Sequence, residues 1–480
     1  MNDRKGFGSN FGFLMAAVGS AVGLGNIWGF PNKMGANGGF PFLILYLALA
    51  LCCGVIIMLG ELALGRKTGH GAVGAYQSIS KRFKWLGWLG IAAAALIFSF
   101  YSALGGYCLR YVVVNFGNLI GAEFGTNGVG GADVFQGLLS QPDVSIAFAL
   151  AFMLITMLVV MSGVGGGIER VCSVGMPALF FILIICIIRS CTLPGAADGL
   201  KYMFVPGWSV ANGIIDEAPS FWKVLTAAGG QMFFSLSLGA GVMITYGSYL
   251  DKKQDLGKSA MIIVGMDTVV ALMAGLCVIP GRFALDPNGA LGGPELLFIT
   301  MQNVFDKMGP AGPVFGILFY LLVFFAAISS SISMLEVIVA HFCDKAREKG
   351  KGDRRKLYSA IAVVICAALC ALVCADGMGS NHISPAELLG LAGAKLPGWS
   401  TSWLGLFDSV AEGLLMPLGA LLMCLMISWE LKPDTLRQEI LLNGENRPWV
   451  YDFFRLCVKY ITPLCMLMIL YGQISDFFIV

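Results

Sequence analysis

The first apolar segment contains the stretch that decides the fold, Gly19-Ser20-Ala21-Val22-Gly23-Leu24-Gly25-Asn26. Apolar residues that favour a helix precede it, and Ile27-Trp28-Gly29-Phe30-Pro31 follows it. A membrane-spanning helix must satisfy its backbone hydrogen bonds internally, because lipid offers no partners. Glycines at three of seven consecutive positions weaken a helix in that setting. The sequence therefore predicts a broken helix whose gap holds something polar.

The composition around this stretch is that of an integral membrane protein. The chain has 480 residues, of which 57% are hydrophobic and 12% charged, whereas soluble proteins carry about 25% charged residues. A net charge of +2 gives no basis for a nucleic-acid partner. The 14 cysteines lie mostly in apolar runs, where they act as small hydrophobic residues, and the three histidines are too widely separated for a metal site. No cleavable signal peptide is expected after the short polar segment Met1–Asn10.

Apolar runs of about 18 or more residues mark candidate membrane spans. Eleven such runs occur: 11–31, 40–64, 88–120, 146–163, 169–190, 222–249, 259–281, 312–342, 357–375, 403–430 and 449–478. Lys and Arg concentrate in every second loop, for example at Arg66 and Arg347, whereas the loop 121–145 has none. The positive-inside rule therefore places the N-terminus in the cytoplasm and Ile479-Val480 outside. No linker divides the chain, so we expect one multi-pass transmembrane domain over 1–480.

A second break lies in the sixth span, at Phe233-Phe234-Ser235-Leu236-Ser237-Leu238-Gly239-Ala240-Gly241. Spans one and six are each the first of a set of five. Because five is odd, the second set enters the membrane from the opposite side. Matching breaks in two such halves point to an inverted-repeat transporter with a binding site at the midplane. The repeats would cover 1–190 and 222–430, with 449–478 as an extra span.

The unwound backbone at such breaks can bind ions. Free N–H groups at a half-helix N-terminus suit a carboxylate, and free carbonyl groups suit a small cation. The alternative interpretation is that these glycines only permit close helix packing. A nucleotide-binding glycine loop fits less well, because no strand precedes Gly23.

Polar residues in other spans support a site at the breaks. Ser329-Ser330-Ser331 places three adjacent hydroxyls in an apolar helix, which favours a cation site. Asp267 lies inside the seventh span with no Lys or Arg near it in that span, so a bound metal cation is its natural counter-charge. Glu61 in span two is expected to accept hydrogen bonds from orphan N–H groups of a broken helix. Tyr101 could meet a substrate carboxylate, or it could be a plain core tyrosine.

Taken together, these stretches resemble the neurotransmitter:sodium symporter family, most of all its eleven-span bacterial amino-acid transporters, which include the leucine transporter. The resemblance runs in order through nearly the whole chain and is carried by Gly19–Trp28, Phe30-Pro31, Asn37–Gly39, Glu61–Arg66, Phe233–Gly239 and Ser329–Ser331. It implies an all-α integral membrane protein of about eleven transmembrane helices, with a five-plus-five inverted repeat and broken helices one and six. It also implies Na⁺-coupled symport of an amino acid by alternating access, and no enzymatic activity. The same resemblance implies the plasma (inner) membrane of a bacterium as the location.

The resemblance implies two Na⁺ sites. The first would be formed by the carbonyl of Ala21, the side chains of Asn26, Ser235 and Asp267, and the substrate carboxylate. The second would be formed by the carbonyls of Gly19, Val22 and Ala326 and the hydroxyls of Ser329 and Ser330. All-oxygen coordination suits a hard cation. Animal members carry a neutral residue at the position of Asp267 and need chloride, so the fixed carboxylate predicts chloride independence.

The resemblance also implies a substrate site. The substrate carboxylate would lie against the N–H groups of Leu24 and Gly25 and the hydroxyl of Tyr101, and its ammonium against carbonyls near Ala21, Phe234 and Ser237. The side-chain pocket would be formed by Ile97, Phe234, Ala240, Ser330 and Met334. Gly23 stands where monoamine transporters carry an aspartate, which predicts a substrate with an intact carboxylate. Ala240 replaces a phenylalanine of the leucine transporter, which favours a bulky apolar or aromatic amino acid.

The gates can be assigned only in part. Arg4 and Asp344 resemble the cytoplasmic gate pair, with Tyr249 nearby and Phe7 where a tryptophan is usual, while Phe234 and Tyr101 would form the outer lid. Gly29 replaces the family's outer-gate arginine, and its acidic partner is not evident among Asp408, Ala411 and Glu412. Because Pro31 intervenes, Lys33 is not expected to replace that arginine.

Two rival functions stay open on sequence alone. One is a carrier of a different solute on the same fold, coupled to protons or sodium. The other is a channel or a transport-dead sensor, although no span shows the repeated polar face of a pore. No nucleophile–base pair supports an enzyme, and the oligomeric state is not determined.

Overall fold

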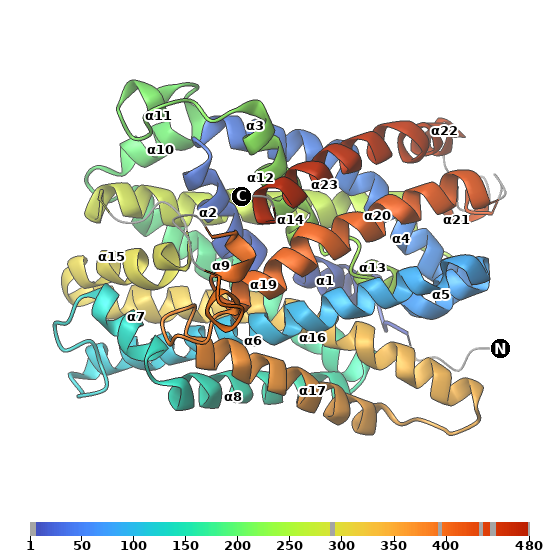
Figure 1. The fold of residues 1–480 in the computed structure, drawn as a ribbon, viewed down its shortest axis with the longest axis horizontal. Coiled ribbons are helices and arrows are strands. Elements are labelled where there is room, and N and C mark those ends of the chain that lie inside the picture. Colours follow the sequence, from blue (N-terminus) through green and yellow to red (C-terminus); the bar gives the residue numbers. More distant parts are fainter. Residues whose placement is uncertain (1–5, 289–292, 392–395, 432–434, 442–447, 479–480) are drawn as a thin grey trace.

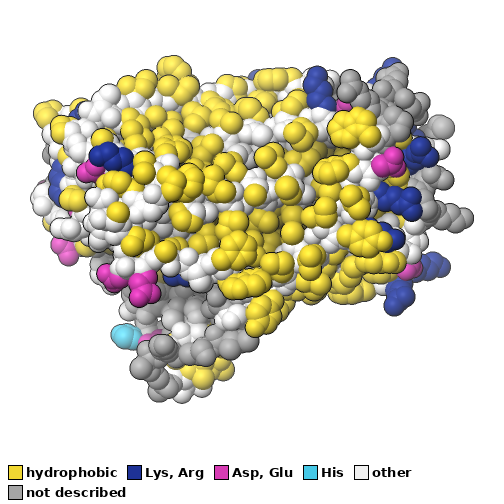
Figure 2. Space-filling view, turned by 90° about the horizontal axis from the view of Figure 1, so that it is seen from above, with side chains coloured by type: hydrophobic (Ala, Val, Ile, Leu, Met, Phe, Trp, Pro, Cys, Tyr) yellow, Lys and Arg dark blue, Asp and Glu magenta, His cyan; other side chains and the backbone are white. Residues whose placement is uncertain are grey.

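The computed structural model describes residues 6–288, 293–391, 396–431, 435–441 and 448–478. These residues form helices joined by loops, with no β-strand among them. Most of the long helices run along the long axis of the molecule (Figure 1). Apolar side chains cover the middle of the molecule, and Lys and Arg gather mainly at one end (Figure 2). We call the end that holds α5 (Ala72–Ile79) the basic end, and the opposite end the far end.

Nine helices within the described ranges are long and apolar enough to cross a membrane. They are Phe40–Thr68, Lys81–Ile120, Pro142–Met161, Val164–Cys191, Leu256–Leu285, Gly309–Glu348, Arg355–Asp376, Trp403–Glu430 and Trp449–Ser475. Each matches one of the predicted spans, with ends that differ by a few residues. Apolar side chains on them stay exposed, for example Val174 at 71% and Val364 at 70%. Such a surface is stable against lipid rather than water, so the predicted all-helical membrane fold is confirmed.

Span one is broken at the predicted stretch. α1 (Asn10–Ala21) ends before Val22, whose backbone is extended, and the chain continues as η1 (Gly25–Gly29) and α2 (Phe30–Ala36). The two halves differ in direction by 44°. The side chain and backbone of Asn26 both bond to Gly23, with Gly23 N–H donating to Asn26 Oδ1 at 3.0 Å and the Asn26 N–H donating to the Gly23 carbonyl at 3.1 Å. Asn26 therefore stabilises the turn that separates the half-helices.

Span six is also divided into two short pieces. α12 (Phe221–Leu236) has 16 residues and α13 (Val242–Gly247) has 6, whereas a single spanning helix needs about 20. The connection passes through the left-handed region at Ser237, Gly239 and Gly241, with φ values of 53°, 79° and 75°. A serine adopts this conformation only at a cost, so neighbouring structure must hold the connection in place.

Glu61 supplies part of that support. Glu61 lies on α4 (Val55–Thr68), and its Oε1 accepts the N–H of Gly239 at 2.7 Å. This contact confirms the prediction that Glu61 satisfies an orphan N–H of a broken helix.

The two breaks lie against each other. The Ser237 hydroxyl donates to the Ser20 carbonyl at 3.2 Å. A Cβ added at Gly25 would lie 3.0 Å from the Phe234 ring and 3.2 Å from Ser235 Cα. Glycine at position 25 thus permits a backbone contact that a side chain would prevent, and two segments about 200 residues apart form one region.

The connections at the far end hold short helices, as expected for the long loops between spans. These are α7 (Gly131–Leu139), α10 (Ala196–Phe204), α11 (Trp208–Ala211), α15 (Met301–Lys307) and α18 (Pro385–Leu388). The remaining long spans that line the breaks are α6 (Lys84–Ile120), α14 (Leu256–Leu285) and α16 (Gly312–Glu348).

Candidate functional site

A carboxylate lies at the centre of the broken-helix region. Asp267 on α14 is fully buried. Its Oδ1 accepts from Asn26 Nδ2 at 2.8 Å, and both of its oxygens lie 3.0 Å from the Ser235 hydroxyl. The structure therefore brings together the three predicted side-chain ligands of the first cation site from η1, α12 and α14.

Tyr46 joins this group, although no motif in the sequence singles it out. Its hydroxyl lies 3.2 Å from Asp267 Oδ2, on α3 (Phe40–Leu49). The direction in which this tyrosine points depends on how span two is rotated against span seven, and a single apolar run carries no signal of that.

The partners of Asp267 are all neutral. Within the described ranges, no Lys, Arg or His forms an ion pair with it. A buried charge is costly unless an opposite charge compensates it. No group of three or more His, Cys, Asp or Glu able to hold a metal occurs among the described residues. A cation here would thus be held by one carboxylate together with amide, hydroxyl and carbonyl oxygens, which suits a hard monovalent ion.

The predicted ligands of the second cation also converge. The Ser329 hydroxyl lies 3.0 Å from the Ala326 carbonyl and 3.5 Å from the Val22 carbonyl. The Ser330 hydroxyl lies 3.4 Å from the carbonyl of Gly19, and also contacts that of Ser20 at 3.0 Å.

More acceptors than donors meet at this place. α1 ends at Ala21, and in the described part of the chain only the Val18 carbonyl of its last turn accepts an N–H from four residues further on. The N–H groups of Gly23 and Leu24 donate to Asn26 and Tyr101 instead. Each serine hydroxyl carries a single hydrogen and can satisfy one of them at a time. The surplus of carbonyl oxygens is what a small cation needs.

Between these two places, residues predicted to bind substrate crowd around Gly23. A Cβ at Gly23 would lie 2.3 Å from both the Tyr101 hydroxyl and the Ser330 hydroxyl. The N–H of Leu24, just past the break, donates to the Tyr101 hydroxyl at 2.5 Å. The rings of Tyr101 and Phe234 lie 6.3 Å apart between centroids. A backbone donor and a tyrosine hydroxyl thus point to one small space beside the helix break.

Other predicted pocket residues are buried, but no described bond links them to this space. Ile97 on α6, Ala240 in the connection between α12 and α13, and Met334 on α16 are at most 4% exposed. Gly90 of α6 packs on Ala240, since a Cβ at Gly90 would lie 3.2 Å from the Ala240 backbone.

At the far end, the structure corrects one expectation. Lys33 forms an ion pair with Glu412, which lies in η8 (Ser409–Leu415), so Lys33 reaches an acidic partner in span ten despite the intervening Pro31. Pro31 does not interrupt the helix, because it occupies the first turn of α2, where a proline is tolerated. Position 33 therefore lies about one helical turn beyond position 29 on the same face.

Gly29 itself has a neighbour in place of an arginine. A Cβ at Gly29 would lie 2.9 Å from Oε1 of Gln231, and Gln231 Nε2 donates to the Gly25 carbonyl at 2.5 Å. The Gln231 side chain therefore occupies the space that a longer residue at position 29 would need.

At the basic end, the predicted gate is only partly visible. Arg4 lies outside the described residues. Asp344 accepts the N–H of Gly71 at 3.0 Å and lies 3.8 Å from Arg347. Phe7 packs edge-on against the Tyr249 ring, with centroids 6.1 Å apart.

Tyr249 leads to an ion pair that sequence reasoning missed. Its hydroxyl donates to Glu336 at 2.5 Å, and Glu336 accepts from Arg355 at 2.5 and 3.0 Å. Glu336 is fully buried on α16. The sequence did carry a signal for this pair, because Glu336 is an acid inside the predicted span 312–342. Arg355, just before predicted span nine, was its candidate partner.

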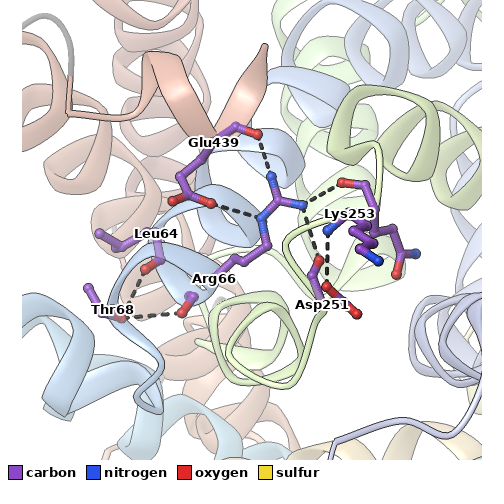
Figure 3. A network of polar contacts seen from close by, with 8 residues as sticks. Leu64, Arg66, Thr68, Asp251, Lys253 and Glu439 are labelled. Atoms are coloured by element: carbon purple, nitrogen blue, oxygen red, sulfur yellow. Dashed lines mark hydrogen bonds and ion pairs between the residues drawn. The ribbon is translucent and has the colours of Figure 1, made fainter. Parts of the chain in front are cut away.

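A second arginine, Arg66 at the end of α4, joins three parts of the chain at this end (Figure 3). Its Nε donates to Glu439 at 2.9 Å, and its other nitrogens donate to the carbonyls of Glu439 and Gln254. Gln254 in turn donates to the Asn10 side chain at 2.6 Å. Span two is thereby tied to α21 (Arg437–Ile440) and, through Gln254, to the start of span one.

A cavity of about 780 Å³ opens beside these contacts. Its lining includes Gly165, Tyr249, Asp344 and Arg355. Asp344 and Arg355 therefore border a space that water can enter.

The chain is similar to known transporters in sequence and in structure. A model of the Sodium:neurotransmitter symporter family matches residues 4–127 and 132–478. A sodium-dependent transporter of Bacillus subtilis, YhdH, is 37% identical over 477 residues, which cover 97% of each chain. A sodium-dependent transporter of Methanocaldococcus jannaschii is 30% identical over 459 residues, covering 91% of this chain and 84% of that one.

The structural likeness is as extensive. The crystal structure of MhsT in complex with L-phenylalanine superposes with a TM-score of 0.83 and 34% identity, covering 98% of this chain and 100% of that one. MhsT and this chain therefore share the same overall fold over nearly their whole length. The protein therefore belongs to the sodium:neurotransmitter symporter family and is a sodium-dependent membrane transporter rather than an enzyme.

Proposed function

We propose that the protein is a Na⁺-coupled symporter that imports an amino acid by alternating access. The observation that carries this proposal is the buried carboxylate of Asp267, surrounded by neutral side chains at the meeting point of both helix breaks. Na⁺ supplies the missing positive charge, and a substrate carboxylate beside the ion is attracted by it. Each ligand then binds more tightly when the other is present, which is the thermodynamic basis of coupling.

Two Na⁺ ions fit the two oxygen-rich places. The first would be held by Asn26, Ser235, Asp267 and the carbonyl of Ala21, together with the substrate carboxylate. The second would be held by the carbonyls of Gly19, Val22 and Ala326 and the hydroxyls of Ser329 and Ser330. The second set contains no carboxylate, so its ion adds a full positive charge near the end of α1, where the helix dipole is negative.

The substrate proposal rests on the space beside Gly23. A carboxylate there would accept the N–H groups of Leu24 and Gly25 and would free the Tyr101 hydroxyl to donate to it. The ammonium would meet the carbonyls near Ala21, Phe234 and Ser237. MhsT, which was crystallised with L-phenylalanine, supports a bulky apolar or aromatic side chain, as does the small residue Ala240 in the proposed pocket.

Transport would not depend on chloride. Tyr46 and Ser235 direct their hydroxyls at Asp267, so a fixed carboxylate already occupies the place where these donors could hold a mobile anion.

The basic end would face the cytoplasm, following the distribution of Lys and Arg. The chain would form one domain of two inverted repeats, 1–190 and 222–430, with the last span added. Lys33–Glu412 would close the outer side together with Phe234 and Tyr101. Asp344 and Arg4, with Tyr249, would close the inner side, and the 780 Å³ cavity beside Tyr249 would be the route of release.

Uptake of radiolabelled amino acids into vesicles that hold the purified protein tests the proposal. We expect uptake when Na⁺ is outside, none when choline replaces Na⁺, and no change when gluconate replaces chloride. A collapse of uptake in gluconate would contradict chloride independence, and a screen in which no amino acid is taken up would refute the substrate class.

Substitution of Asp267 tests the site itself. Asp267→Ala should abolish Na⁺-dependent binding, because it removes the only charged side chain among the proposed ligands. Asp267→Asn is the matched variant, since its amide can still bond Ser235 and Tyr46 while its charge is lost, and we expect greatly weakened Na⁺ binding in a folded protein. Full Na⁺ affinity in Asp267→Ala would refute the site.

A further inference from the structure

A shallow pocket lies at the basic end between the last two spans, away from the transport site. Its volume is about 40 Å³. One wall is formed by Ser428, Leu431 and Leu436, and the other includes Phe454, Arg455 and Lys459. The second wall belongs to α22 (Pro448–Leu456) and η11 (Cys457–Ile461), the start of the last span.

Two cations border this pocket without a carboxylate partner. Arg455 and Lys459 are four residues apart on a continuous helical stretch, so their side chains lie on one face. In the part of the chain that the structure describes, neither forms an ion pair, and Asp452 on the same helix pairs with neither. The Lys459 ammonium lies 5.0 Å from the centroid of the Tyr460 ring. The ring carries no net charge, so the positive charge of Lys459 is not neutralised. Such a pair attracts an anion.

The surface around the pocket is apolar and aromatic. Trp449, Phe453, Leu456 and Tyr460 are each more than half exposed. Trp and Tyr are enriched at the membrane–water interface, where lipid phosphates lie. The occupant must therefore combine a negative head with an apolar body.

We propose that Arg455 and Lys459 bind the phosphate of an anionic phospholipid from the leaflet at the basic end. Arg455 is exposed at this pocket, so a phosphate group can approach it from the surface, and the acyl chains would lie over Phe453, Leu456 and Tyr460. A zwitterionic lipid brings its own cation beside Arg455 and Lys459, so a lipid with net negative charge fits better. Basic sites between transmembrane helices commonly recognise such head groups.

A bound head group would also stabilise α21, the short helix that carries the carboxylate partner of Arg66. Leu436, in the pocket wall, directly precedes α21, and Glu439 on α21 is the carboxylate partner of Arg66. Lipid binding would therefore raise the thermal stability of the purified protein. This inference concerns a lipid site and holds whatever the transported substrate is.

Native mass spectrometry of the purified full-length protein, titrated with phosphatidylglycerol or phosphatidylcholine, tests the site. We expect R455Q/K459Q to bind phosphatidylglycerol roughly tenfold more weakly than the unaltered protein, because each cation near a membrane surface contributes several-fold. Phosphatidylcholine binding should be weak and equal in both. The charge-conserving variant R455K/K459R should retain most of the affinity.

The matched control is K349Q/K351Q, which removes the same charge from two exposed lysines of another loop at the basic end. An equal loss in this control, or equal binding of the two lipids, would overturn the proposal. Competition by millimolar inorganic phosphate would assign the site to free phosphate and overturn the lipid assignment. If the double variant does not yield monodisperse protein, the single variants R455Q and K459Q are measured instead. Each should bind phosphatidylglycerol about threefold more weakly than the unaltered protein.

Discussion

Ion pairs of different kinds lie at the two ends of the bundle. At the far end, one lysine, Lys33, contacts Glu412 and keeps 24% of its side chain exposed. At the basic end, Arg355 binds both carboxylate oxygens of the fully buried Glu336. Arg66 donates to the carboxylate and the backbone carbonyl of Glu439 on α21 and to the backbone carbonyl of Gln254.

This difference indicates how easily each end opens. A guanidinium holds several acceptors in fixed directions, whereas an ammonium is a strongly hydrated point charge. Opening the far end would separate Lys33 from Glu412, which is a partly solvated contact. Opening the basic end would break the buried contacts of Arg355 and Arg66. We therefore expect the far end to open more readily, and substitutions at the two ends should differ in effect accordingly.

The largest effect is expected at Arg355. Arg355→Gln leaves Glu336 as a buried, unpaired carboxylate, which costs about 3–5 kcal/mol. A marked fall in the unfolding temperature of the purified protein checks this. The double variant E336Q/R355Q should recover much of the loss because no buried charge remains. An unchanged unfolding temperature in R355Q would remove the proposed difference between the ends.

A smaller effect is expected at Arg66. Arg66→Lys keeps the charge but cannot reach Glu439 and the Gln254 carbonyl together, so a loss of about 2 kcal/mol is expected from buried acceptors left without donors. The unfolding temperature again reports it. Lys67→Gln, at the exposed neighbouring position, is the control and should have no effect. Equal stability of Arg66→Lys and the unaltered protein would show that charge alone suffices.

Lys33 should matter less for stability, because its side chain is partly solvated. We expect a coupling energy of about 1 kcal/mol between Lys33→Gln and Glu412→Gln in a double-mutant cycle, measured on the rate of Na⁺-dependent uptake. Lys33→Arg should retain uptake. A coupling energy near zero would mean that the pair does not close the far end.

The smallest effect is expected at an exposed pair of the far end. Lys201 and Asp198 lie 3.0 Å apart, with 51% and 54% of their side chains exposed. Lys201→Gln should change the unfolding free energy by less than about 0.5 kcal/mol. A larger change would show that solvent-exposed ion pairs at the far end contribute more to the unfolding free energy than we expect.

The fold and the inner part of the candidate site could be predicted from local sequence. Both breaks and the bond from Gly239 to Glu61 agree with the expectations drawn from residue types and order, and the clustering of Asn26, Ser235 and Asp267 agrees with what the family resemblance implied. Each of these expectations rests on groups that lipid cannot satisfy, which must find partners in the gaps that glycine creates.

The missed and mistaken residues share another property. Tyr46, Glu336 and Arg355 act through partners on other spans, and Lys33 was rejected because Pro31 was taken to interrupt the helix. Their roles depend on the rotation and depth of each helix against its neighbours. An apolar run specifies neither quantity.

The sequence by itself determined that the chain crosses the membrane many times, where two spans break, and which oxygen-bearing residues stand at those breaks. These features follow from a local requirement, since every backbone group in lipid needs a partner within its own segment or at a polar gap. Only the tertiary structure decided that Tyr46 faces Asp267, that Lys33 pairs with Glu412, and that Arg355 and Arg66 pair with buried acids at the basic end. Those pairings are set by how the helices pack, which no single segment encodes.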